Sequence, residues 1–293
     1  MTVRLGDLIA VLEAAYPPAL AESWDTGIGL TCGDPEADVT GVLLAVDLDL
    51  AVVAQAEELG AQLVLTHHPL LFRPVQSVAV DTPKGALLHR MIGSGIAHYA
   101  AHTNADKAVG GVNDVLAALL GLTQVRPLVP DPPDALPAGH PQAGRTGTGR
   151  VGELPEPCTL AELTERVAKL LPPTTSGVRS AGDADRVVRA LALCGGAGDS
   201  ELDSAIAVGA DAYLTSDLRH HVVQEHLATP GAPAVVEVAH WAGEWPWLAA
   251  AACLLTGAVA DGTLAGSVTT TVSALRTDPW TVHRPSGQTP EGF

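Results

Sequence analysis

The feature that most constrains this chain is a short apolar run that ends in two adjacent histidines, within residues 63–70. Residues 63–66 are apolar or β-branched and turn residues follow them, which is typical of a buried strand. Pro69 ends this strand and fixes the turn that holds His67 and His68. Neighbouring side chains on extended backbone point to opposite faces, so the pair is poorly placed to chelate one ion and suits two ions side by side. Two ordinary turn histidines after a core strand are the structural alternative.

The bulk composition narrows the class of protein. The 293 residues are 47% hydrophobic, which suffices for a large core in one domain or in two lobes. A formal charge of −17 with no cluster of basic residues argues against binding to nucleic acid. The four cysteines form no CxxC pair, which argues against a disulfide framework or a cysteine-type zinc site. We see no signal peptide and no apolar run of about 18 residues that could span a membrane, so we expect a cytoplasmic protein.

Strands and helices alternate along the chain, which predicts an α/β fold with mixed, largely parallel sheets. The first set has expected helices at 5–12, 50–59, 84–92 and 112–120, and strands at 39–46, 63–66 and 96–101. The second set has expected helices at 160–171, 200–208, 218–227 and 246–255, and strands at 187–193, 212–215, 234–238 and 267–272. We therefore expect two similar lobes and two connecting or terminal segments: an N-terminal lobe at 1–128, a Pro/Gly-rich linker at 129–150, a C-terminal lobe at 151–277 and a loose tail at 278–293.

Candidate metal ligands follow three of these apolar strands. They are His67 and His68, His102 with Asp106, and His240 with Glu244. Loops at the carboxyl ends of strands converge in open α/β sheets, so these side chains can meet in one crevice. Imidazoles together with carboxylates suit Zn, Fe, Mn or Ni. His240 and Glu244 lie one helical turn apart, and a glutamate has two oxygens with which to bridge two ions.

Each of these residues also has an ordinary structural role. Asp106 suits a turn or a cap, Glu244 suits a solvated first helical turn, and His240 suits a satisfied core position. Their coincidence at three strand ends favours a metal site over the separate roles. The expected site holds two divalent ions and has five ligands: His67, His68, Asp106, His240 and Glu244.

Two further features lie close to this set. His102 is expected to orient the ligands or to relay a proton. The glycine-rich segment 195–198 stands between a strand and a helix, where backbone N–H groups could cradle a phosphate. It lacks both the P-loop ending and the dinucleotide fingerprint, so a tight turn is the favoured interpretation.

The sequence resembles the NIF-three-like family, whose members are usually labelled GTP cyclohydrolase 1 type 2 homologues. Six blocks in the same order carry the resemblance: 67–72, 101–106, 110–114, 194–198, 215–221 and 240–246. The resemblance extends to about Leu255 and implies a dinuclear metal site between two similar α/β lobes. It places the family's ligands on the five residues named above, with Glu244 as the bridge. It also implies a toroidal homohexamer.

Two departures from the family pattern are visible. Residues 24–30 carry Thr26 where the family often has Asn, and this segment holds one extra residue. We expect this change to affect the rim of the pocket and not the metal site. Larger members carry an extra domain in mid-chain. Here the stretch between Leu128 and Ser176 is expected to hold only the linker and one helix.

Two classes of function are compatible with this set of residues. The favoured one is a metal-dependent hydrolase, in which Glu244 holds both ions and His102 relays protons. Its substrate would be a small molecule, by family label a nucleotide such as GTP. The alternative is a non-catalytic metal-handling or regulatory scaffold that forms a homo-oligomeric ring.

Overall fold

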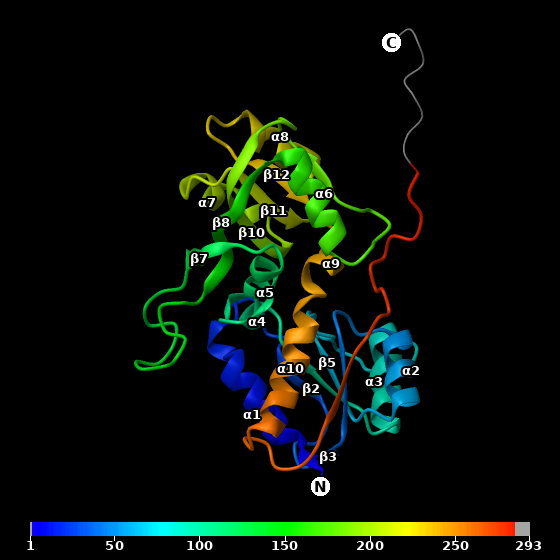
Figure 1. Cartoon of the computed structure of the whole chain (residues 1–293). Helices are drawn as coiled ribbons and strands as arrows, with labels where there is room; N and C mark the ends of the chain where they lie inside the picture. The colour runs from blue at the N-terminus through cyan, green and yellow to red at the C-terminus, as the bar shows by residue number, and fades with distance from the viewer. Residues whose placement is uncertain (1, 285–293) are drawn as a thin grey trace.

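The computed structural model describes residues 2–284 and arranges them around two large sheets (Figure 1). The first sheet contains the histidine strand at its centre. In spatial order its strands are β13 (Thr269–Val272), β4 (Gly41–Ala45), β5 (Leu63–Thr66), β6 (Ala97–Ala100) and β2 (Gly29–Cys32). The first four strands are parallel to one another, and β2 runs antiparallel to β6. All four residues of β5 are buried, as expected for a central parallel strand.

The second sheet has six strands. In spatial order they are β7 (Thr123–Pro130), β8 (Gly147–Thr159), β10 (Val187–Ala197), β11 (Ala212–Ser216), β12 (Ala234–Glu237) and β9 (Arg179–Ala181). The central strands β10, β11 and β12 are parallel, whereas β7, β8 and β9 pair antiparallel. A separate two-stranded sheet joins β1 (Val3–Arg4) to β3 (Asp38–Val39). The expected fold class, α/β with mixed and largely parallel sheets, is confirmed.

Helices pack around both sheets. They are α1 (Leu5–Ala15), α2 (Leu50–Leu59), α3 (Pro83–Gly93), α4 (Thr103–Lys107), α5 (Val112–Leu119), α6 (Leu160–Leu170), α7 (Leu202–Ala207), α8 (His220–Ala228), α9 (His240–Glu244) and α10 (Trp247–Ala260), with short 3-10 turns at Pro18–Leu20 and Asp199–Glu201. The predicted end of α2 is confirmed, because Gly60 adopts the left-handed conformation with a φ of +63°. The predicted capping box of α6 is also present, formed by Thr159 and Glu162.

The expectation for the middle of the chain is wrong. The stretch between Leu128 and Ser176 holds the 13-residue strand β8 as well as a loop and a helix. Strand β8 pairs with β7 on one side and with β10 on the other. Its many Gly and Pro residues hide the alternation by which a strand is recognised, and Gly147 and Gly149 have positive φ values. Residues 131–146 contain no helix or strand.

The closing strand joins the other sheet. We expected 267–272 to end the second α/β set, but β13 pairs in parallel with β4 of the first sheet, with Thr270 opposite Val42. Helix α10 carries the chain back and lies alongside α1 (Figure 1). One edge strand of the first sheet therefore comes from the predicted C-terminal lobe. The lobe bounds 1–128 and 151–277 stay a prediction.

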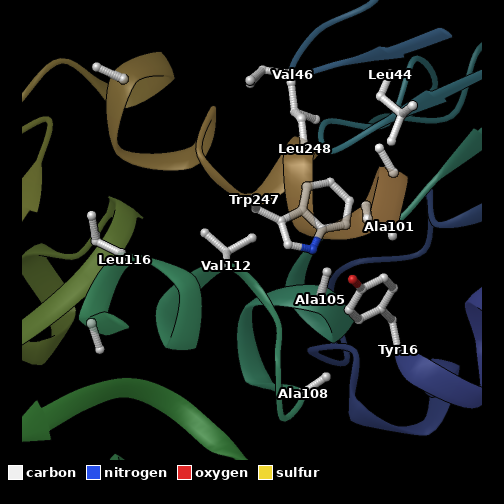
Figure 2. Close-up of a cluster of buried hydrophobic side chains, with 14 of the residues drawn as sticks. Tyr16, Leu44, Val46, Ala101, Ala105, Ala108, Val112, Leu116, Trp247 and Leu248 are labelled. Carbon is white, nitrogen blue, oxygen red and sulfur yellow. The ribbon is translucent and has the colours of Figure 1, made fainter. Parts of the chain in front are cut away.

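The core beneath the histidine strand is built around Trp247, the first residue of α10. Its side chain is 1% exposed, and Figure 2 shows it among Tyr16, Val112 and Leu248. Its ring centroid lies 5.4 Å from that of Tyr16 and 5.5 Å from that of His67. The apolar core thus supports one face of a predicted metal ligand.

Two further expectations concern the ends of the chain and its helices. Of the expected loose tail at 278–293, residues 278–284 form no helix or strand, and 285–293 lie outside the described residues. None of the helices within residues 2–284 combines the length and the apolarity that a membrane crossing requires.

A buried histidine in this sheet predicts a pH dependence of stability. His98 on β6 is fully buried, and burial lowers the pKa of its imidazole to about 3. Its Nε2–H donates to the Thr66 hydroxyl at 2.7 Å, since that hydroxyl itself donates to the carbonyl of His68. The folded pKa lies below the unfolded value of about 6.5, so the protein loses stability as pH falls below 6.5.

We compare the free energy of unfolding of the wild type with that of His98→Gln. Between pH 7.5 and pH 5.5 the wild type should lose about 1.4 kcal/mol relative to the variant. Urea unfolding at both pH values measures this difference. His89→Gln, an exposed position on α3, is the control variant. A difference that stays constant with pH would contradict the prediction.

Candidate metal centre

Three of the predicted ligands, His67, His68 and His240, meet at a fourth, Glu244, and the fifth, Asp106, lies beside His67. His67 and His68 follow β5, Asp106 lies in α4 directly after β6, and His240 and Glu244 form the ends of α9 directly after β12. Glu244 Oε1 lies 2.9 Å from His240 Nε2 and 3.4 Å from His67 Nε2. Its Oε2 lies 3.1 Å from His68 Nε2, and Asp106 Oδ1 lies 3.6 Å from His67 Nε2. Side chains from both large sheets thus converge on one buried carboxylate.

The two adjacent histidines point the same way. We expected their rings on opposite faces, and this expectation is wrong because the strand ends at Thr66 and a bend re-aims both side chains. Ligand atoms of His67, His68 and His102 lie within 4.8 Å of one another. Those of His68, His240 and Glu244 form a second such group. His68 is shared between the groups, and His102 joins the set of possible ligands.

The donor atoms fit a pair of divalent cations. Three buried atoms at this point have no hydrogen-bond partner within residues 2–284: His67 Nε2, Asp106 Oδ1 and Glu244 Oε2. Buried polar atoms are normally paired, so their orientation toward one shared space needs an explanation. Imidazole nitrogens with carboxylate oxygens are the donors that Zn, Fe, Mn and Ni accept.

An oxygen acceptor holds the Nδ1 atom of each histidine in this set. Such an acceptor fixes the tautomer and leaves Nε2 unprotonated and free to bind a metal when the imidazole is neutral. The four pairs are His68 with Asp47 at 2.7 Å, His240 with Asp217 at 2.7 Å, His102 with Asp25 at 3.0 Å and His67 with the Ala101 carbonyl at 2.9 Å.

The three aspartates of these pairs were missed in the sequence. Asp47 and Asp217 stand just beyond the ends of β4 and β11, where the rule that selected the histidines would also have found them. Asp217 adopts a φ of +57°, an uncommon conformation for a residue other than glycine. Asp25 lies in the segment 24–30, is buried, and also accepts from the backbone N–H and the hydroxyl of Thr103.

The electrostatics of the cluster place protons on the imidazoles. Burial opposes a charge on His68, but the carboxylates of Glu244 and Asp47 raise its pKa to about 10. The Glu244 charge raises the pKa of His240 to about 11. Burial opposes the charge of Glu244 as well, yet His240, His68 and His67 hold its pKa well below its usual range. Bound cations would replace these protons, so metal binding releases them.

Two cavities reach the cluster, and His68 and His240 line both of them. The first has a volume of about 610 Å³, and Trp24 and Phe72 lie on its wall. The second, of about 690 Å³, is lined by Asp47, Asp217 and Asp278 among others. Both volumes fall within the range typical of small-molecule sites.

The glycine-rich segment 195–198 includes the end of β10 and lies against the cluster. Gly196 has a φ of +74°, and a Cβ placed there would lie 2.6 Å from Glu244 Oε1 and 3.2 Å from His240 Nε2. Only glycine allows this approach of backbone to ligand. The geometry therefore supports a packing role for this segment next to the metal ligands.

Comparison with known proteins identifies the class. A model of the Duf34/NIF3 (NGG1p interacting factor 3) family matches residues 3–279, so the chain belongs to this family. It is similar to a "GTP cyclohydrolase 1 type 2 homolog" of Streptomyces coelicolor, at 46% identity over 98% of this chain and 96% of the relative. It is also similar to a "Protein NIF3 homolog" of Schizosaccharomyces pombe, at 33% identity over 74% of this chain and 77% of the relative.

A solved structure agrees with the fold. A Bacillus cereus protein related to NIF3 superposes with a TM-score of 0.87 at 27% identity, covering 97% of this chain and all of that one. The family resemblance inferred from the six sequence blocks is confirmed.

Metal binding predicts a change in thermal stability. Adding Mn²⁺ or Zn²⁺ in excess is expected to raise the melting temperature, because an ion that binds only the folded state adds about 2.7 kcal/mol at a hundred times its Kd. Glu244→Gln should lose most of this rise, since it removes the charge that faces three imidazoles. Scanning calorimetry with and without a chelator measures the shift. Glu225→Gln, on an exposed part of α8, is the control, and an equal rise in both variants would refute the assignment.

A methyl group at Gly196 tests the close approach to Glu244. Gly196→Ala is expected to weaken metal affinity by roughly 10- to 100-fold, as for other changes that displace metal ligands. Gly209→Ala is a matched control, because Gly209 has a φ of +72° with no atom near its Cβ position. Both variants should lose stability, but only Gly196→Ala should bind metal more weakly in isothermal titration calorimetry. Equal affinities in the two variants would contradict the prediction.

Proposed function

We propose that this chain binds two divalent metal ions at the cluster around Glu244 and hydrolyses a small molecule, with a nucleotide or a related compound as the favoured substrate. The observation that carries this proposal is the convergence of three imidazoles on the buried Glu244 carboxylate, with Asp106 beside His67, next to a cavity of about 610 Å³. The name carried by the Streptomyces coelicolor relative, "GTP cyclohydrolase 1 type 2 homolog", supports the same reaction class.

The ligands in this proposal are His67, His68, Asp106, His240 and Glu244. Ions held there would acidify a water molecule and polarise the bond that it attacks. Glu244, fixed by three imidazoles and 2% exposed, would contact both ions.

His102 has the position of a proton carrier. It lines the first cavity, and its Nδ1–H donates to Asp25 at 3.0 Å, which leaves Nε2 free to take up or give a proton. Asp25 is itself held by Thr103, so the orientation of the imidazole is fixed. Trp24 and Phe72 stand beside His102 on the same wall of the cavity, with their rings edge-on to the imidazole.

We further propose that the chain acts as a homo-oligomer, in the form of a hexameric ring, and in the cytoplasm. The family resemblance supports the ring. The four cysteines, all of them free thiols, suit a reducing compartment.

Turnover of GTP by the metal-loaded protein tests the proposal. We expect ring-opening hydrolysis in the wild type, and a loss of at least 100-fold in kcat/KM for His68→Ala, since removal of one ligand disturbs both groups that share it. His102→Asn is expected to lower kcat while metal stoichiometry stays at two ions per chain. Chromatography of the products and metal analysis give the two readouts.

A protein that binds metal without turnover would fit the alternative function, a non-catalytic metal-handling scaffold. Tight binding of two ions without turnover of nucleotides, phosphoesters or small amides would refute hydrolysis and leave reversible metal handling. Equal rates for the wild type and His68→Ala would show that any observed hydrolysis belongs to another site.

A further inference from the structure

One wall of the 610 Å³ cavity is made of aromatic rings. Trp24 is 57% exposed and Phe72 is 42% exposed, although side chains of this size are usually buried. The ring centroids of Trp24 and Phe72 lie 5.9 Å apart. The centroid of His102 lies 6.2 Å from that of Trp24 and 5.9 Å from that of Phe72. The three rings meet edge to face, at interplanar angles of 70°, 77° and 84°. They come from three different segments and line one wall beside the candidate metal ligands.

Apart from the imidazoles of the cluster, most charged side chains that line the same cavity are acidic. Its carboxylates are Glu22, Asp106, Glu201 and Glu244, and the one amine among its described lining residues is Lys107. Lys107 is already paired, at 2.6 Å with Glu22 and at 3.2 Å with Asp131. The described lining therefore offers a polyphosphate tail no unpaired lysine or arginine, only the imidazoles of the cluster and the cations proposed to bind there. It offers a wall of edge-to-face rings to a planar ligand.

We propose that Trp24 and Phe72 form a stacking subsite that holds a planar nitrogen heterocycle, such as a nucleobase, beside the metal cluster, with the heterocycle stacked on one ring and in edge contact with the other. The subsite recognises the π-face of the ring and leaves its polar edge directed at the acidic lining. A ring held there lies beside His102, the proton carrier described above. This inference rests on the proposed function for its chemistry, since it names the substrate class of the same site.

The loop that carries Trp24 is anchored for this role. Its neighbour Asp25 is buried and accepts from His102 and Thr103. Gly27 packs against Pro69, and a Cβ there would lie 2.9 Å from Pro69 Cβ. The exposed indole therefore stands on a fixed backbone, which lowers the entropic cost of stacking a ligand on it.

Binding of guanosine to the Mn²⁺-loaded full-length protein tests the subsite. We expect Trp24→Ala to raise the Kd for guanosine by roughly 5- to 150-fold, the effect of losing one stacked ring. Phe72→Ala should weaken binding in the same direction, and Trp24→Phe should restore most of the affinity because it restores a ring. Isothermal titration calorimetry measures the Kd for guanosine and, separately, for Mn²⁺.

Three controls separate stacking from other effects. Trp280→Ala removes a tryptophan that is 64% exposed and lines the second cavity, and it should leave guanosine binding unchanged. Ribose 5-phosphate, which has no heterocycle, should bind the wild type and Trp24→Ala equally. The Kd for Mn²⁺ should be the same in the wild type and in Trp24→Ala.

The results also distinguish this inference from the proposed function. Dependence of guanosine affinity on Trp24 in a protein that shows no turnover would uphold the subsite and refute the hydrolase. If the protein turns over substrate but Trp24→Ala and Phe72→Ala leave the Kd for guanosine unchanged, the subsite alone would be overturned. Light scattering measures the mass of the oligomer. If Trp24→Ala changes this mass together with the guanosine affinity, the rings belong to a contact between copies of the chain, and the subsite would also be overturned.

Discussion

The burial of the Glu244 carboxylate is the constraint on which the rest of the site depends. An ionised carboxylate at 2% exposure is costly unless opposite charges and hydrogen-bond donors surround it. His67 and His68 follow a strand of the first sheet, and His240 follows a strand of the second. The two sheets must therefore be placed so that all three imidazoles lie within 3.4 Å of one carboxylate. The raised pKa values of His68 and His240 are the electrostatic consequence of this meeting. Cations bound in place of those protons would neutralise the same carboxylate.

The surrounding fold holds this arrangement in place from several directions. Trp247 packs beneath His67, and helix α10 returns the chain to the first sheet, where β13 adds an edge strand (Figures 1 and 2). An aspartate or a carbonyl oxygen fixes the second nitrogen of every histidine in the cluster. Ligands held by both packing and hydrogen bonds keep their geometry, which is what tight metal binding and catalysis require. Gly196 adds a steric condition, since any side chain there would reach Glu244.

Both cavities beside the cluster are lined by carboxylates and by an exposed tryptophan, Trp24 in the first and Trp280 in the second. The first differs in that the rings of Trp24 and Phe72 lie next to each other and to His102. Such a group of rings suits an organic ligand. In the proposed hydrolase these rings would hold an organic substrate beside the candidate metal ligands, a role that a scaffold which only stores metal would not need.

The sequence alone determined the fold class, because strand periodicity is local, and it pointed to five candidate ligands, because histidines directly after strands are uncommon. The aspartates that hold them were not found, since single aspartates after strands are common in any loop. Strand β8 was missed because its Gly and Pro residues break the alternation that marks a strand. Only the tertiary structure decided that β13 joins β4, and that His67 and His68 turn toward one point. Both features depend on residues that are far away in the chain. Hydrogen bonds between strands and contacts of a buried charge form between groups that are close in space, whatever their separation in the sequence.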